Sequence, residues 1–103
     1  MLSLDTAFDR IGSALRQRGY AFARAETETD SGDRFAIFHS PNTTVRVFWK
    51  GKARLLILQV QINGEWVEFA RRGFGPMGLE DTAVEALVRA VSNEVAETST
   101  DSD

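Results

Sequence analysis

The sequence predicts an α+β domain in which a five-stranded antiparallel meander is flanked by N- and C-terminal helices packed on one face (α-β-β-β-β-β-α). Three observations predict this class. Near both ends of the chain, apolar residues recur with a period of about 3.6, which indicates amphipathic helices. Between residues 20 and 72 the period falls to about 2, as in half-buried strands. The connections between the expected strands are short, so strands adjacent in sequence pair antiparallel.

The first helix is expected over residues 4–18. Its apolar stripe is formed by Leu4, Phe8, Ile11 and Leu15. Ser3 can cap its first turn, because a serine hydroxyl accepts hydrogen bonds from free backbone N–H groups there. Gly19 can adopt the left-handed conformation that commonly follows the last turn of a helix.

Five strands are expected over residues 20–26, 34–39, 43–49, 54–62 and 65–72. Ser40-Pro41-Asn42 is the predicted turn between the second and third strands, and Asn63-Gly64 predicts a tight hairpin between the last two. A second helix is expected over residues 79–96. We therefore expect one domain over residues 1–97, followed by a disordered acidic tail over 98–103.

Composition limits the class of protein. The chain has 103 residues, a net charge of −3 and no cysteine, which excludes a disulfide scaffold and cysteine–zinc sites. No signal peptide is visible, and the longest apolar run, Leu55–Leu58, is too short to span a bilayer. We expect a soluble cytoplasmic protein with no membrane contact. Residues 34–72 hold seven basic and two acidic residues, whereas both flanking segments are acidic. A basic centre favours either an anionic partner or contact with the acidic helices of the same domain.

Alternation along the strands divides the sheet into two faces. The expected core face carries Tyr20, Phe22, Phe35, Ile37, Val45, Val47, Trp49, Leu56, Leu58, Val60, Ile62, Val67 and Phe69. The other face carries Ala36, Phe38, Thr44, Arg46, Phe48, Ile57, Gln59, Gln61, Trp66 and Glu68. With both helices on one side, this second face is expected to be open.

The open face is the main functional prediction, because tryptophan, other aromatics and arginine are typical of protein interfaces. The predicted partner-binding residues are Phe38, Arg46, Phe48, Gln59, Gln61 and Trp66. The protein is interpreted as a small non-enzymatic adaptor, inhibitor or immunity-type protein that needs no cofactor. Two alternatives stay open: single-stranded nucleic acid stacked on the rings, and structural covering by self-association or by a terminal segment.

A local resemblance supports the nucleic-acid alternative. Val45-Arg46-Val47-Phe48-Trp49-Lys50-Gly51-Lys52, a following strand, an Asn-Gly turn, Arg71-Arg72-Gly73 and a final helix resemble the PC4 family of single-stranded-DNA-binding transcription cofactors over residues 34–95. The resemblance implies a strand meander that ends in a helix, with basic residues near the hairpin tip. Candidate anion or nucleic-acid contacts are Lys50, Lys52, Arg54, Arg71 and Arg72.

Several motifs fail on context. Gly73–Gly78 matches G-x-G-x-x-G, but no parallel strand follows it, so only a weaker anion site with Arg71 and Arg72 remains open. The acidic loop at residues 26–33 lacks calcium-loop spacing. His39 is the only histidine; it is expected to border the core, and no nucleophile is placed to form a triad with it. No catalytic residue and no metal site are predicted, and the protein is not expected to be an enzyme.

Overall fold

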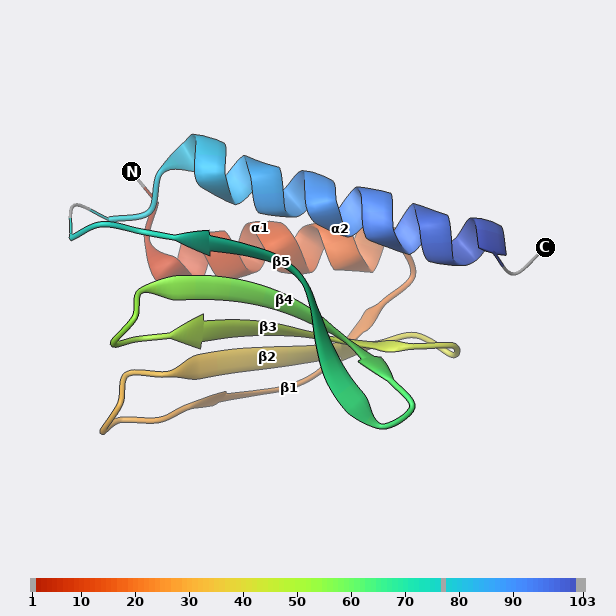
Figure 1. Cartoon of the computed structure of the whole chain (residues 1–103), viewed down its shortest axis with the longest axis horizontal. Helices are drawn as coiled ribbons and strands as arrows, with labels where there is room; N and C mark the ends of the chain where they lie inside the picture. The colour runs from red at the N-terminus through yellow and green to blue at the C-terminus, as the bar shows by residue number, and fades with distance from the viewer. Residues whose placement is uncertain (1, 77, 102–103) are drawn as a thin grey trace.

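The computed structural model describes residues 2–76 and 78–101 and contains the predicted order of elements. The elements are α1 (Leu4–Gln17), β1 (Ala21–Thr27), β2 (Arg34–His39), β3 (Thr44–Lys50), β4 (Leu55–Ile62), β5 (Glu65–Gly73) and α2 (Asp81–Asp101). The five strands form one antiparallel sheet in the order β1-β2-β3-β4-β5 (Figure 1). The predicted α+β meander is therefore confirmed.

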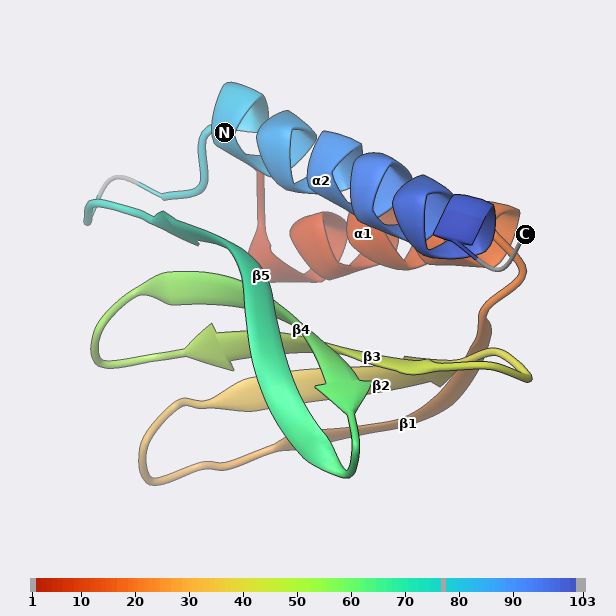
Figure 2. The ribbon, with the colours of Figure 1, turned by 45° about the vertical axis from the view of Figure 1, so that its right-hand side comes forward.

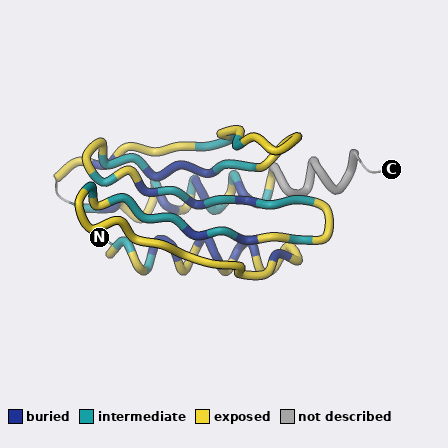
Figure 3. The backbone as a smooth tube through the Cα atoms, turned by 90° about the horizontal axis from the view of Figure 1, so that it is seen from below, coloured by how far each residue is buried: buried dark blue, intermediate teal, exposed yellow. Residues whose placement is uncertain are grey.

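The two helices lie side by side over one face of the sheet (Figures 1 and 2). Among the described residues, no helix or strand covers the other face, which is seen in front of the helices in Figure 3. Ser3 caps α1 as predicted, since its Oγ accepts a hydrogen bond from the Thr6 N–H at 3.1 Å. Gly19 has a φ of +91°, the left-handed conformation expected after the helix.

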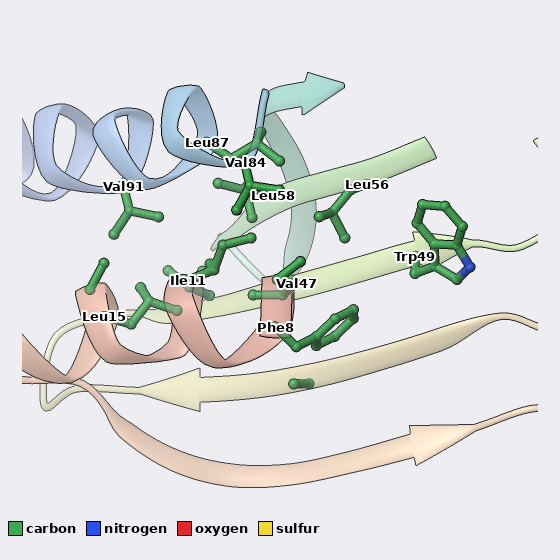
Figure 4. Close-up of a cluster of buried hydrophobic side chains, with 14 of the residues drawn as sticks. Phe8, Ile11, Leu15, Val47, Trp49, Leu56, Leu58, Val84, Leu87 and Val91 are labelled. Atoms are coloured by element: carbon green, nitrogen blue, oxygen red, sulfur yellow. The ribbon is translucent and has the colours of Figure 1, made fainter. Parts of the chain in front are cut away.

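The core lies between the helices and the sheet (Figure 4). Its most deeply buried large side chains are Ile11, Leu15, Val45, Val47, Leu56, Leu58, Val84, Leu87 and Val91. Phe74 and Leu79, which the alternation along the strands did not place, are also buried in this core. They anchor the connection between β5 and α2 onto the helical side of the domain.

The predicted facing of β2 is wrong. Phe38 and Ala36 are buried in the core, whereas Phe35 and Ile37 lie on the opposite face. The turn before β3 decides this outcome. The Ser40 N–H donates to the Thr43 carbonyl at 2.8 Å, so the turn holds four residues and not the three predicted. A shift of one residue moves every side chain of a strand to the other face.

Smaller differences concern the margins of the sheet. Phe22, Ile62 and Val67 were predicted in the core, but they are 49%, 50% and 43% exposed because they lie on an edge strand or near the β4–β5 turn. His39 is exposed and does not border the core.

Helix α2 continues to Asp101, four residues into the segment predicted as a tail, and residues 102 and 103 lie outside the described residues. Neither described helix is long and apolar enough to cross a membrane.

Candidate functional site

The face of the sheet opposite the helices, called the open face below, is organised in rows that cross the strands. Residues directly opposite each other in an antiparallel pair project to the same side, so the strand register gives each row. One row reads Glu26, Phe35, Phe48, Ile57 and Arg71 from β1 to β5, and the next reads Arg24, Ile37, Arg46, Gln59 and Glu68. The centre of the open face therefore combines aromatic and aliphatic side chains with Arg46 and Gln59, and charged residues lie at both edges.

Arg46 lies at the centre of the open face within a cluster of rings. Its Cζ is 4.5 Å from the ring centroid of Trp66, 4.9 Å from that of Phe48 and 5.9 Å from that of Phe35. Its Nε donates a hydrogen bond of 2.7 Å to the Gln59 side-chain oxygen. Burial lowers the pKa of the Arg46 guanidinium, since desolvation disfavours the charged form. We call these five residues the Arg46 cluster.

Two rings of the Arg46 cluster, those of Phe35 and Phe48, pack against each other. The Phe35 and Phe48 centroids are 6.4 Å apart with the rings inclined by 56°. Ile57, in the same row, is only 5% exposed although it faces away from the helices. Offset and tilted ring pairs stabilise each other beyond simple burial. The centre of the open face is therefore a second, smaller apolar cluster with an arginine fixed on it.

A pocket of about 350 Å³ opens beside the Arg46 cluster, where the β1–β2 loop meets the sheet. It is lined by Glu26, Thr27, Glu28, Asp33, Phe35, Arg46 and Phe48. The loop is fixed because the Glu28 N–H donates to the Asp33 carbonyl at 2.7 Å, and the Asp33 Oδ1 accepts from the Gly51 N–H at 2.8 Å. Three carboxylates beside two rings make a site that suits a positively charged group.

Ion pairs occupy both edges of the open face. On β1, Arg24 and Glu26 are 3.4 Å apart, and the Arg24 Cζ lies 5.6 Å from the Phe35 ring centroid. On β5, the guanidinium of Arg71 donates to both carboxylate oxygens of Glu68 at 2.7 and 2.6 Å. These hydrogen bonds from Arg71 lower the pKa of the Glu68 carboxyl.

Glu68→Gln tests this interaction through its pH dependence. Because the folded-state pKa of Glu68 is lowered, the folded protein binds fewer protons than the unfolded chain in mildly acidic solution, and stability rises with pH through that window. The stabilisation is thus present at neutral pH and lost as pH falls through the lowered pKa. In urea unfolding, we expect Glu68→Gln to be slightly less stable than wild type at neutral pH and equal to it in strong acid. A difference that persists in strong acid contradicts this account.

The structure brings five of the six predicted partner-binding residues together. Arg46, Phe48, Gln59, Gln61 and Trp66 lie on the open face. Phe38 does not, because it is 4% exposed and packs in the core beneath α1. Phe35 and Ile37 take the places predicted for Phe38 and Ala36. A prediction of four residues in the turn at 40–43, in place of three, would have placed Phe35 and Ile37 on the open face.

The predicted anion or nucleic-acid contacts are spread over different surfaces. Lys50 ends β3, and Lys52 lies in the following turn. Arg54 turns toward the helical side, where its Nε donates to the Gly75 carbonyl at 3.0 Å. Arg71 is paired with Glu68, and the Arg72 guanidinium donates to the backbone carbonyl of Arg71 at 2.9 Å. The loop at 73–78 includes Met77, which lies outside the described residues, so its anion site stays a prediction.

Among the residues described, no group of three or more histidine, aspartate or glutamate side chains is placed to hold a metal ion. Comparison of the chain with protein-family models, with curated proteins and with solved structures found no match. The resemblance to the PC4 family therefore stays a prediction.

Proposed function

We propose that this chain is a small protein-binding module whose open face docks a protein partner. The observation that carries the proposal is the Arg46 cluster: an arginine held among Trp66, Phe48 and Phe35 and hydrogen-bonded to Gln59. Tryptophan and arginine are the residue types that most often dominate binding energy at protein interfaces. Here they lie together on a sheet face that no described element covers.

The preorganisation of the Arg46 cluster supports this proposal. A free arginine loses about 2 kcal/mol of side-chain conformational freedom when it is fixed in an interface. Arg46 already has its Nε bonded to Gln59, and its guanidinium already lies on two rings within 5 Å. Much of that entropic cost is therefore met during folding, which leaves more of the contact energy for binding.

Single-stranded nucleic acid remains the competing hypothesis, and the charges of the open face fit it less well. Phosphate binding needs free basic side chains along a groove. Arg46 is bonded to Gln59, Arg71 is bonded to Glu68, and the pocket beside the rings is lined by three carboxylates. Those carboxylates would repel a phosphate backbone. Binding to single-stranded DNA or RNA at low salt, weakening steeply as salt rises, would favour this hypothesis.

Trp66→Ala tests the proposed function. In affinity capture from an extract of the native host, we expect a specific protein to bind the wild-type chain and to be lost from the variant. Removing a tryptophan that dominates an interface typically costs about 2 kcal/mol or more of binding energy, or about 30-fold in Kd. The unfolding midpoint should change little, because Trp66 is only partly buried and lies near the start of β5.

The matched control is Arg10→Ala on the outer surface of α1, where Arg10 pairs with Glu85 at 3.1 Å. This variant should retain the captured protein. The proposal fails if Trp66→Ala captures the same protein as well as wild type does. A partner that disappears after nuclease treatment points to nucleic acid.

A further inference from the structure

From the strand register and the charges of the open face, we infer that the partner of this face is a second copy of the chain, so that two sheets pack face to face in a symmetric dimer. The inference rests on the proposed function, because it names the partner of the same surface. In a two-fold dimer, one patch must be complementary to itself. The open face meets this requirement in its charges, its rings and its pocket.

The charges at the corners of the open face alternate. On β1, Glu26 lies in one row and Arg24 in the next; on β5, Arg71 lies in the first of these rows and Glu68 in the second. One row thus begins negative and ends positive, and the other begins positive and ends negative. A two-fold axis that runs across the strands, between the two rows, exchanges the rows. It places Glu26 opposite Arg24 of the second copy, and Arg71 opposite Glu68 of the second copy.

The same rotation also matches the centre of the face. It places Phe48 opposite Arg46 of the second copy, and Phe35 opposite Ile37 of the second copy. The Arg46 guanidinium already lies 4.5 Å from the Trp66 ring and 4.9 Å from the Phe48 ring of its own chain, and a ring of the second copy would remove it further from water. The attraction between a guanidinium and aromatic rings is stronger when the guanidinium is removed from water. The two copies of Arg46 lie on opposite sides of the axis and do not face each other.

The pocket beside Phe35 gains an occupant in this arrangement. Its carboxylates, Glu26, Glu28 and Asp33, outnumber the one guanidinium that lines it, that of Arg46. Arg24 of the second copy projects toward Glu26, and its guanidinium is of a size and charge that suit the pocket. Arg24 already stacks on a phenylalanine ring within its own chain, with Cζ 5.6 Å from the Phe35 centroid.

The expected packing is an aligned sandwich. Facing sheets lie about 10 Å apart and their strands cross at about 30°, which displaces the edge strands by about 5 Å along one another. Arginine and glutamate side chains are long enough to span this displacement. Five strands about 4.8 Å apart give a face of roughly 20 Å by 20 Å. This face is smaller than the area of about 800 Å² per partner that a standard interface buries. We therefore expect a small interface and a micromolar dimer.

The first measurement is the mass of the full chain by sedimentation equilibrium and light scattering, from micromolar to millimolar concentration. One chain has a mass of 11.4 kDa, and we expect the mass to rise to twice this value with concentration. Arg24→Glu and Glu26→Arg each place like charges opposite each other, and each should weaken the dimer at least about ten-fold. Both residues are exposed on the edge strand β1, so circular dichroism should show that both variants fold.

A mixture of the two variants tests the proposed axis. In a mixed pair, the two glutamates of the Arg24→Glu chain face the two arginines of the Glu26→Arg chain, so dimerisation should recover to near the wild-type level. An axis along the strands would bring β1 over β5 of the second copy, and mixing would restore nothing. The matched control is Arg10→Glu on the helical side, which should dimerise like wild type.

Three results overturn the inference: a wild-type mass of one chain at every concentration, a dimer that tolerates Arg24→Glu, or folded variants that do not recover on mixing. The proposed function fails separately. If the chain is a monomer but its Trp66→Ala variant loses a different captured protein, the open face binds protein and the second copy is the wrong partner.

Discussion

Phe38→Ala is expected to lower the free energy of unfolding by about 3–5 kcal/mol, the usual cost of removing a buried phenylalanine ring. Phe38 is 4% exposed, and its ring meets that of Phe22 edge to face at a centroid distance of 5.7 Å. It also packs against Gly12 of α1 so closely that an added Cβ there would lie 3.0 Å from the Phe38 Cζ. Removing the ring therefore leaves a cavity between α1 and β2. Urea unfolding measures the loss directly.

Phe35→Ala is the matched control, because it removes the same ring from the same strand but from the open face. Phe35 is only partly buried, and we expect its removal to cost about 1 kcal/mol, near the average for point variants. If the two alanine variants lose equal stability, or if Phe35→Ala loses more, then the facing of β2 described above is incorrect.

The facing of β2 shows where sequence patterns stop being informative. In Phe35-Ala36-Ile37-Phe38 both sets of alternate residues are apolar, so a period of 2 gives no contrast between the faces. A turn of three residues would pair Ile37 with Val45, whereas the four-residue turn pairs Phe38 with Val45. In β3 the contrast is strong, since Val45 and Val47 alternate with Arg46. The facing of β3 was therefore predicted correctly.

The positions of the charged corners depend on two β-bulges that the sequence does not mark. Simple alternation from Tyr20 and Phe22 would place Arg24 on the core face. The bulge between Phe22 and Arg24 adds a residue to β1 and turns Arg24 to the open face. A second bulge in β5, opposite Leu58 and Gln59, brings Arg71 to the face that already carries Glu68. Local composition predicts neither shift, because a bulge is a property of the pairing of two strands.

The components of the Arg46 cluster were better predicted than its pocket. Arg46, Phe48 and Gln59 follow from alternation in β3 and β4. The turn between these strands, residues 51–54, holds an even number of residues, as predicted, so both strands face as expected. The pocket depends on contacts between loops that are distant in sequence, chiefly the hydrogen bond from the Gly51 N–H to Asp33. No periodic pattern records such a contact, so it is available only from the folded chain.

Gly51→Ala is expected to disrupt this contact between the loops and to lower the free energy of unfolding by about 1–3 kcal/mol, as overpacking of a tight site does. An added Cβ would lie 2.7 Å from the carbonyl oxygens of Ser31 and Gly32, closer than such atoms approach in proteins. The atoms that the added Cβ would meet belong to the backbone of Ser31 and Gly32, so no side-chain rotation can relieve the contact. The β1–β2 loop must move away, and the hydrogen bond of 2.8 Å to the Asp33 carboxylate is strained with it.

Gly75→Ala is the control for this change, because among the described residues no atom beyond its two chain neighbours lies within 4 Å of an added Cβ there, and it should be neutral or slightly stabilising. Equal stability of the two variants would contradict the close approach of the loops. The pocket provides a second measurement, since Asp33 lines it together with Phe35 and Phe48. If the loop holds the pocket in shape, NMR shifts from Gly51→Ala should spread to Phe35 and Phe48. The proposed dimer should also weaken, although no residue of the two rows that face the second copy has changed.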